Sequence, residues 1–142
     1  MFYNQVNTYL SISILGFVLY NMLYLIMGKI NAKNKGSAYE RKLAKEFREY
    51  GFEDCKTSRF ESKMLDDLGV DLTNTGFFNV QAKAVERLGC YHDILASMPQ
   101  NDNNYNTIFH KRNRKGEVVV MTKEDFYEIM EMLIKLDVLN VK

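Results

Sequence analysis

The feature that most constrains this chain is an N-terminal segment without a charged residue. Residues 1–28 contain no Asp, Glu, Lys or Arg, and residues 9–27 form a 19-residue run dominated by Leu, Ile, Tyr and Met. As an α-helix this run would be about 28 Å long, close to the roughly 30 Å hydrocarbon core of a bilayer. The sequence therefore predicts a hydrophobic N-terminal helix over residues 1–28, long enough to anchor the protein in a membrane.

Two other interpretations of this segment stay open. It could be an extra helix packed on the folded domain or on a second subunit, or natural translation could begin at Met27. A signal peptide is disfavoured, because no basic region precedes the apolar run and no small-residue cleavage site follows it. If the segment is an anchor, Lys29, Lys33 and Lys35 directly after it would keep the remainder of the chain in the cytoplasm.

The remainder of the chain has the composition of one globular domain. Residues 29–36 are polar and predict a linker, and residues 37–142 are long enough to build one core. The whole chain has 19 basic and 18 acidic residues, so no overall field indicates a nucleic-acid partner. Cys55 and Cys90 lack the spacing of a metal site, and reduced thiols in the cytoplasm are expected.

Capping and periodicity divide the domain into alternating helices and strands. Ser37 followed by Glu40 forms a capping box for a helix over residues 37–50, which ends at Gly51. Strands are expected over residues 54–59, 107–112 and 117–121, with a hairpin over 70–83 and an exposed loop over 100–106. Residues 60–69 predict a mobile loop or a short helix, and a short helix is expected before Pro99. Thr122 begins an amphipathic helix to residue 136, with an inward face of Phe126, Ile129, Met130 and Leu133. This order predicts an α/β fold with a mixed central sheet flanked by helices.

The predicted hairpin carries an unusual polar face. Asn74, Thr75 and Gly76 form its turn, and a hairpin centred on Thr75 would place Asp71 opposite Asn79. The period of two along a strand then puts four polar residues on one face, namely Asp71, Asn79, Gln81 and Lys83. The other face is apolar, with Val70, Leu72, Phe78, Val80, Ala82 and Ala84. Asp71 and Gln81 would be diagonal neighbours, roughly 7–8 Å apart and close enough to share a metal ion.

These polar residues suit a magnesium site. Mg²⁺ prefers oxygen ligands, which Asp71 and the Gln81 amide could supply. Lys83 on the same face could orient or deprotonate an attacking water, or stabilise the charge of the transition state. Glu40 lies on the inward side of its helix and could join the site directly or through water, although it could also serve as a helix cap. Such a site would cleave a phosphodiester by in-line attack of metal-activated water.

The pattern of Glu40, then Asp71, then Gln81-Ala82-Lys83 resembles the PD-(D/E)xK nuclease superfamily. The segment GSAYERKLAKEFREYGF, which contains Glu40, is similar to the Holliday junction resolvase-like proteins of archaea and phages. The resemblance covers residues 35–135. It implies an αβββαβ core, Mg²⁺ with Mn²⁺ as a substitute, and often a homodimer that cuts branched DNA during recombination, repair or phage genome processing. It further implies that Glu40, Asp71 and Gln81 hold the metal and that Lys83, with Glu40, is catalytic.

One position departs from this pattern. Most relatives have a glutamate where this chain has Gln81, which removes a negative charge and should weaken metal binding. Asp67, four residues before Asp71, could supply the lost charge. A glutamate at position 81 is expected to tighten metal binding if the site is real.

Basic residues near the expected site are candidates for binding DNA phosphates. The candidates are Arg59, Lys63, Lys111, Arg112, Arg114 and Lys115. His92 and His110 lack partners at catalytic spacing and are expected to be surface or packing residues. Three functions follow: a magnesium-dependent endonuclease acting on branched or otherwise structured DNA, a catalytically weak or inactive DNA-binding module of the same fold, and a membrane-associated restriction-like nuclease. The first of these, the endonuclease, is the function that the sequence favours, and the other two are its alternatives.

Overall fold

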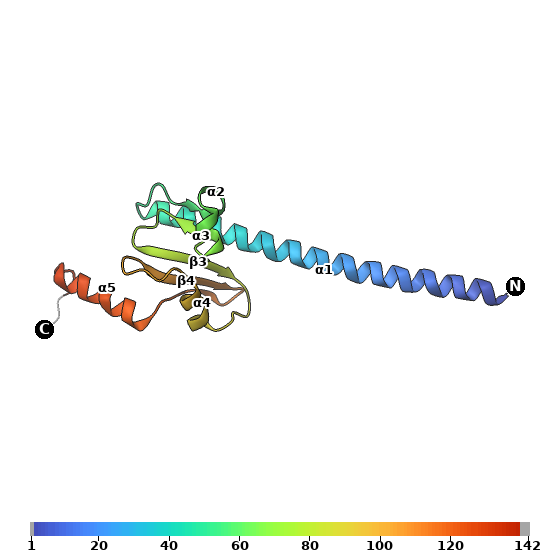
Figure 1. Cartoon of the computed structure of the whole chain (residues 1–142). Coiled ribbons are helices and arrows are strands. Elements are labelled where there is room, and N and C mark those ends of the chain that lie inside the picture. Colours follow the sequence, from blue (N-terminus) through green and yellow to red (C-terminus); the bar gives the residue numbers. More distant parts are fainter. Residues whose placement is uncertain (1, 140–142) are drawn as a thin grey trace. The chain divides into compact units, whose positions relative to one another are not determined.

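The computed structural model of the chain describes the backbone of residues 2–139 and the side chains from Leu15 to Leu139. The chain divides into two compact units, Met1–Lys35 and Gly36–Lys142. The first unit is the N-terminal part of helix α1, Phe2–Glu49, and the second holds the remaining elements (Figure 1).

Helix α1 runs through the segment that was expected to be a linker. Residues 29–36 are helical, so the predicted helix start at Ser37 is wrong, although the chain divides into its two units at the end of this segment. The segment is polar but contains no proline, and its single glycine, Gly36, costs a helix about 1 kcal/mol, which does not interrupt it. Ser37 consequently does not cap a helix. Its hydroxyl instead accepts a hydrogen bond from Arg59.

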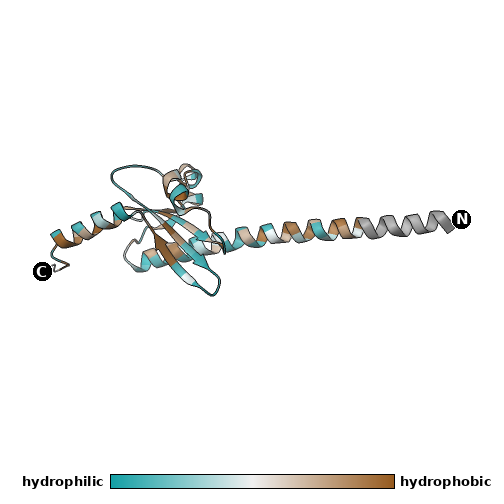
Figure 2. Cartoon of the chain, turned by 90° about the horizontal axis from the view of Figure 1, so that it is seen from below, coloured by the Kyte–Doolittle hydropathy of each residue, from teal (hydrophilic) through white to brown (hydrophobic). Residues whose placement is uncertain are grey.

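The predicted hydrophobic N-terminal helix is confirmed. Twelve large apolar side chains between Leu15 and Ile30 are 48–70 % exposed, and Figure 2 shows this stretch as mostly hydrophobic. Within the described residues, one helical segment, Leu15–Glu49, is long and apolar enough to cross a membrane by length and composition. Whether it does so remains a prediction.

The second unit is a mixed α/β domain, which confirms the expected class. Its elements after α1 are β1 (Lys56–Thr57), α2 (Ser58–Glu61), α3 (Lys63–Asp67), β2 (Leu72–Thr73), β3 (Phe78–Ala84), α4 (Tyr91–Ser97), β4 (Tyr105–Arg112), β5 (Gly116–Val120) and α5 (Lys123–Lys135). The main sheet has the order β3-β4-β5 and is mixed: β3 and β4 are parallel, and β4 and β5 are antiparallel. Helix α4 is the crossover that two parallel strands require.

The region before β3 differs most from expectation. The predicted strand over residues 54–59 is reduced to β1, because the chain turns into α2 at Ser58. β2 pairs with β1 and not with β3, so the predicted hairpin is not a regular ladder. Its register is also shifted by one residue, since the Asp71 N–H donates to the Val80 carbonyl rather than facing Asn79. In Figure 1, β3 lies between β4 and the α2–α3 segment.

Two hydrophobic clusters cover the two faces of the sheet. One joins Tyr39, Leu43 and Ala44 of α1 to Cys55, Leu72, Val80, Ala82 and Ala84. The other joins Val70, Leu95, Met98 and Ile108. β3 is therefore covered on both faces, and the polar face predicted for it is not open to solvent along its whole length. Asn79 is buried and its amide donates to Asn106.

Helix α5 forms as expected but packs less than expected. The Thr122 hydroxyl accepts from the Asp125 N–H, which is the predicted N-terminal cap. No residue of α5 is buried, Phe126 is 50 % exposed, and the other three residues of its predicted inward face are half-buried. The helix is amphipathic, and its apolar side remains largely exposed in the described part of the chain.

Candidate functional site

The centre of the candidate site is the carboxylate of Asp71, between β2 and β3. Its Oδ2 accepts a 2.6 Å hydrogen bond from the Ala82 N–H, and its backbone N–H donates to the Val80 carbonyl. The Asp71 side chain thus accepts from a backbone N–H that would otherwise bond a neighbouring strand, and this hydrogen bond holds the carboxylate against β3. Burial raises the pKa of Asp71 to about 6, the Glu40 and Asp66 carboxylates add to the rise, and the Ala82 N–H and Lys83 oppose it.

Glu40 faces the same region from α1. Its side chain is 6 % exposed and forms a 2.9 Å ion pair with Arg59. Burial raises the pKa of Glu40, and nearby Asp66 raises it further, whereas Arg59, Arg41 and Lys83 lower it. A carboxylate in this position is not a helix cap, because α1 continues on both sides of it. The structure therefore removes the capping alternative for Glu40.

Gln81 and Lys83 lie on β3, just after Val80, whose carbonyl accepts a hydrogen bond from the Asp71 N–H. Gln81 is 8 % exposed, and its carbonyl Oε1 is buried without a hydrogen-bond partner. Lys83 is half-buried, and its charge acts on both Asp71 and Glu40. The structure thus brings together Glu40, Asp71 and Lys83 electrostatically, with Gln81 on the same strand as Lys83.

Asp66 is a site residue that sequence reasoning assigned no role. Its carboxylate influences both Glu40 and Asp71 and lies 3.9 Å from the Arg59 side chain. Asp67, the residue considered from the sequence, is exposed, and no interaction with the site is found for it. The helical phase of α3 decides which of the two neighbouring aspartates faces the site. That helix was one of two open alternatives for residues 60–69.

The predicted phosphate-binding residues fall into different environments. Arg59 is engaged with Glu40, Asp66 and Ser37. Lys111 lies 3.7 Å from Glu117, and its ammonium stacks on the Tyr39 ring. Lys63 lies exposed on α3. Arg112, Arg114 and Lys115 are exposed on the β4–β5 turn, where they remain accessible to an anion.

The two histidines take structural or surface positions. His110 is buried, its Nδ1 lies 2.9 Å from the Tyr91 hydroxyl, and its Nε2 lies 2.9 Å from the Val85 carbonyl. Both ring nitrogens are therefore used in joining β4 to the region around α4. His92 is exposed. Neither histidine contributes to the Asp71 region.

The oxygen atoms of this candidate site are of the kind that a hard divalent cation prefers, but few of them carry a negative charge. Among the described residues, no three Asp, Glu, His or Cys side chains group as a metal site. The amide at Gln81 supplies an oxygen where a third carboxylate would otherwise stand. Its unpartnered buried Oε1 is the observation that fits a cation, because buried carbonyl oxygens normally have a partner.

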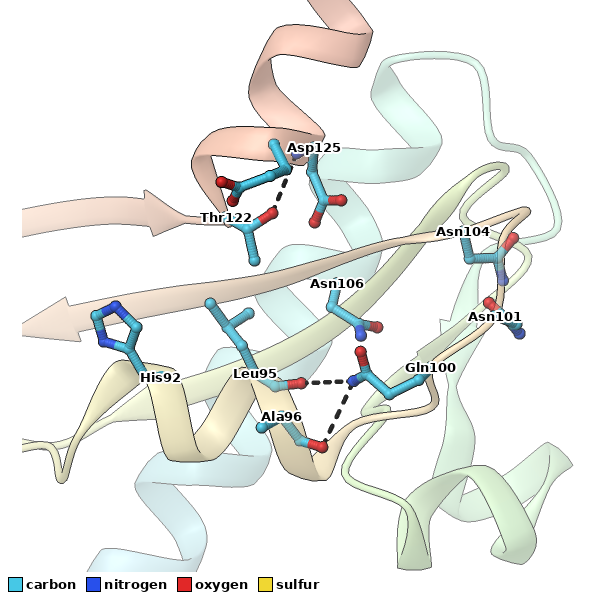
Figure 3. A pocket seen from close by; sticks show the side chains of 10 residues that line it. His92, Leu95, Ala96, Gln100, Asn101, Asn104, Asn106, Thr122 and Asp125 are labelled. Carbon is cyan, nitrogen blue, oxygen red and sulfur yellow. Dashed lines mark hydrogen bonds between the residues drawn. The ribbon is translucent and has the colours of Figure 1, made fainter.

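A pocket lies between α4 and the start of α5, away from Asp71 and Glu40 (Figure 3). It has a volume of about 410 Å³, and its polar lining includes His92, Glu124, Asp125 and four amide side chains, two of which bond the protein's own backbone. Gln100 donates to the carbonyls of Leu95 and Met98, and Asn106 donates to the Pro99 carbonyl. The Gln100 and Asn106 side chains of this pocket therefore stabilise the loop after α4, and we assign the pocket no chemical function.

No model of a known protein family, no curated protein and no solved structure matches this chain. Any function must therefore be inferred from the residues themselves. A buried carboxylate pair, an amide oxygen and a lysine beside an electropositive turn have the chemistry to hold a divalent cation next to a phosphate.

Proposed function

We propose that the domain from Gly36 is a magnesium-dependent endonuclease of the PD-(D/E)xK type, acting on branched or otherwise structured DNA. One observation carries the proposal: Asp71, fixed by the Ala82 N–H, is electrostatically coupled to Glu40 and Lys83, which come from two other parts of the sequence. These are the residues whose spacing resembles that superfamily. The αβββαβ core is part of this proposal, because β1, β2 and the β3-β4-β5 sheet supply strands in the required order.

Each residue has a distinct role in the proposed site. Asp71 and Glu40 supply negative charge, and Gln81 supplies a neutral oxygen donor. A bound Mg²⁺ (or Mn²⁺ in its place) would polarise the phosphate and lower the pKa of the attacking water. Lys83 carries a positive charge beside both carboxylates, where it can stabilise negative charge that develops on the phosphate or orient the water.

The substrate is inferred from the basic residues. Arg112, Arg114 and Lys115 on the exposed β4–β5 turn can contact phosphates without reading bases, which suits recognition of DNA shape. A homodimer would provide two such sites for the two strands of a branched substrate. The exposed apolar side of α5 is a surface that such a dimer could bury.

The test is cleavage by the full chain in detergent with Mg²⁺, with four-way junction, flap, nicked and linear duplexes offered side by side. Asp71→Asn and Lys83→Ala should each reduce cleavage at least about a hundredfold, since each removes a group that acts at the reacting phosphate. Lys45→Ala is the matched control, because Lys45 is 73 % exposed and pairs with Glu49 on α1. Equal cleavage by the wild type and both site variants would overturn the assignment.

A second candidate function is a DNA-binding module of the same fold with little or no catalysis. Gln81 favours this candidate, because an amide replaces a carboxylate and fewer than three acidic side chains group at the site in the described residues. Titration with Mg²⁺ separates the two functions. Junction binding that persists without any Mg²⁺ binding would support the inactive module.

The exposed apolar helix favours a membrane-associated form of the nuclease. With α1 as an anchor, the basic residues after it would keep the domain in the cytoplasm, where it could meet incoming DNA as a restriction-like enzyme does. Preference for linear duplex over a junction in the same assay would favour this role over junction resolution.

A further inference from the structure

Another pocket of the domain, formed by α1, β1 and α2, has a basic lining. It has a volume of about 330 Å³, and no acidic side chain of the described residues lines it. Three cations share the lining with an aromatic ring and two small side chains, namely Arg41, Arg48, Lys56, Phe60, Ala44 and Thr57. A pocket of this composition suits a ligand that combines negative charge with a flat apolar group.

Phe60 is the part of this lining that the fold does not explain. Its side chain is 90 % exposed, more than any other large apolar side chain among the described residues. Apolar surface left in water is unfavourable, and this ring packs into neither hydrophobic cluster of the domain. The face of such a ring can stack on a nucleic-acid base, whatever the base, because every base has a π-face.

The cations of the pocket are placed to hold phosphates around that ring. Arg41 and Arg48 lie seven residues apart on α1, hence on one face and about 10 Å apart along its axis. Arg48 donates a 2.6 Å hydrogen bond to the Cys55 carbonyl, but a guanidinium has five N–H donors and can bond a phosphate as well. Lys56 lies 3.5 Å from Glu61 in an exposed pair, which contributes little and can be exchanged for a phosphate.

The pocket borders the candidate site. Arg41 directly follows Glu40 on α1, and Phe60 directly follows Arg59 on α2. Arg59 and Glu40 form a 2.9 Å ion pair, so the residues next to them are held close together as well. A strand seated in the pocket would therefore pass beside Glu40.

We propose that this pocket binds an unpaired stretch of a DNA strand, with one base stacked on Phe60 and the neighbouring phosphates held by Arg41, Arg48 and Lys56. This inference rests on the proposed function, because it names the part of the DNA substrate that lies beside the candidate site. Repeated phosphates match a lining of three cations better than a second copy of this chain does, since the chain has 19 basic and 18 acidic residues. Stacking holds a base without reading the sequence, which suits a substrate recognised by its unpaired segment.

The experiment measures binding of a fluorescent oligothymidylate of about ten nucleotides to the full chain in detergent and EDTA, by fluorescence anisotropy. A strand with the same phosphates but no bases is the comparison. The wild type should bind the thymidylate about tenfold more tightly than the abasic strand, and Phe60→Ala should abolish this difference. Phe60→Trp should keep the difference, because an indole also stacks on a base.

The matched control for the ring is Tyr50→Ala, because Tyr50 is 87 % exposed and does not line the pocket. It should bind both strands like the wild type. Arg41→Ala should weaken binding of both strands about threefold and lower the salt dependence, since it removes one phosphate contact. Lys135→Ala, on exposed α5, removes the same charge elsewhere and should not change binding.

The outcomes separate this inference from the proposed function. Equal binding of the two strands by the wild type, or an unchanged preference in Phe60→Ala, would overturn the base-stacking pocket. Loss of a dimer in analytical ultracentrifugation of Phe60→Ala, with the preference unchanged, would instead assign the pocket to a second copy of the chain. If the preference depends on Phe60 but the wild type cuts no DNA with Mg²⁺, the pocket stands and the nuclease fails. Cleavage by the wild type without a base preference gives the reverse.

Discussion

At the scale of single residues, Gln81 is the position on which the strength of the proposed cation site depends most. Its buried Oε1 has no partner, and it stands where the resemblance calls for a carboxylate. Replacing it with glutamate adds a charge without changing the length of the side chain. If Gln81 belongs to the proposed cation site with Asp71 and Glu40, that charge is unfavourable when no cation is present and favourable when one is bound.

We therefore predict that Gln81→Glu lowers the thermal midpoint in EDTA and binds Mg²⁺ about tenfold more tightly than the wild type. Calorimetric titration and thermal unfolding with and without Mg²⁺ measure both effects. Gln81→Met is the matched control, since it keeps the size of the side chain and removes the oxygen. A midpoint that does not respond to Mg²⁺ in the glutamate variant would place Gln81 outside the site.

Asp71 gives a prediction that does not depend on activity. Its pKa of about 6 in the folded state lies above the usual value of 3.8, so the folded protein favours the protonated form. The stability that this proton contributes is complete below about pH 4 and is lost as the pH rises through 6. Asp71→Asn is uncharged at every pH, and its amide oxygen can still accept from the Ala82 N–H.

In EDTA, Asp71→Asn should therefore be more stable than the wild type by about 2 kcal/mol at pH 8, and the difference should shrink toward pH 4. Urea unfolding at pH 4.5 and pH 8 measures it. Asp67→Asn is the control, because this exposed aspartate should show no such dependence. A wild type that is the more stable protein at pH 8 would contradict the buried environment assigned to Asp71.

At the scale of elements, the turn from α3 into β2 sets the geometry of the site. Gly69 has φ +76°, and a Cβ built there would lie 2.6 Å from the Gln81 Nε2. An alanine would therefore be strained in its backbone and would push the Gln81 amide from its place. We expect Gly69→Ala to lower the free energy of unfolding by about 1–3 kcal/mol and to weaken cation binding.

The matched control for this turn is Gly89→Ala. A Cβ at Gly89 would meet no atom within 4 Å, so its stability should change little in the same urea unfolding measurement. Equal losses in the two variants would show that the close approach between Gly69 and Gln81 does not constrain the site.

The elements that the sequence predicted well are those with local signals. Thr122 at the start of α5, and the alternation around β4 and β5, place these elements within about two residues of their expected bounds, because caps and side-chain periods are local properties. Glu40 and Lys83 lie on α1 and β3, elements with a clear period, whereas Asp71 precedes β2 and is held to β3 by its own hydrogen bonds. That these three residues form one site remains a prediction. Two predictions failed for different reasons. The pairing of β2 with β1 depends on tertiary contacts, whereas α1 continues through Gly36 because one glycine costs too little to interrupt a helix.

Asp66 shows why one residue of the candidate site could not be predicted from the sequence. Two adjacent aspartates are equivalent in sequence, and only the phase of a five-residue helix distinguishes them. The ion pairs of Arg59 join residues 19 and 7 positions away, which no local pattern links. A helix predicted over residues 63–67 would have distinguished the two aspartates, because it places residues 66 and 67 on different faces.

At the scale of the whole molecule, two apolar surfaces are exposed in the described part of the chain. One is on α5, where Phe126, Tyr127 and Ile134 are exposed, and the other is the run of apolar side chains of α1 from Leu15 to Ile30. Exposed apolar surface of this extent is unfavourable in water and indicates a partner or a membrane. The two surfaces differ in kind. Helix α5 is amphipathic, whereas the exposed apolar residues of α1 at positions 17–20 and 22–27 are consecutive and therefore lie on all sides of the helix.

A helix that is apolar on every side suits lipid better than a protein interface, which would cover one side of it. We therefore predict that the full chain sediments with membranes and resists extraction at alkaline pH, and that a fragment of residues 36–142 stays in the soluble fraction. Immunoblots of fractionated cells measure both. A variant with Leu19, Leu23 and Ile26 all changed to Lys is the matched control, because it keeps the length of the helix and disrupts its apolar run at the expected bilayer centre. Such charges cost about 3 kcal/mol each in a bilayer, so this variant should leave the membrane. Full-length protein found wholly in the soluble fraction would instead make α1 an interface between proteins, and the proposed nuclease would then act without a membrane.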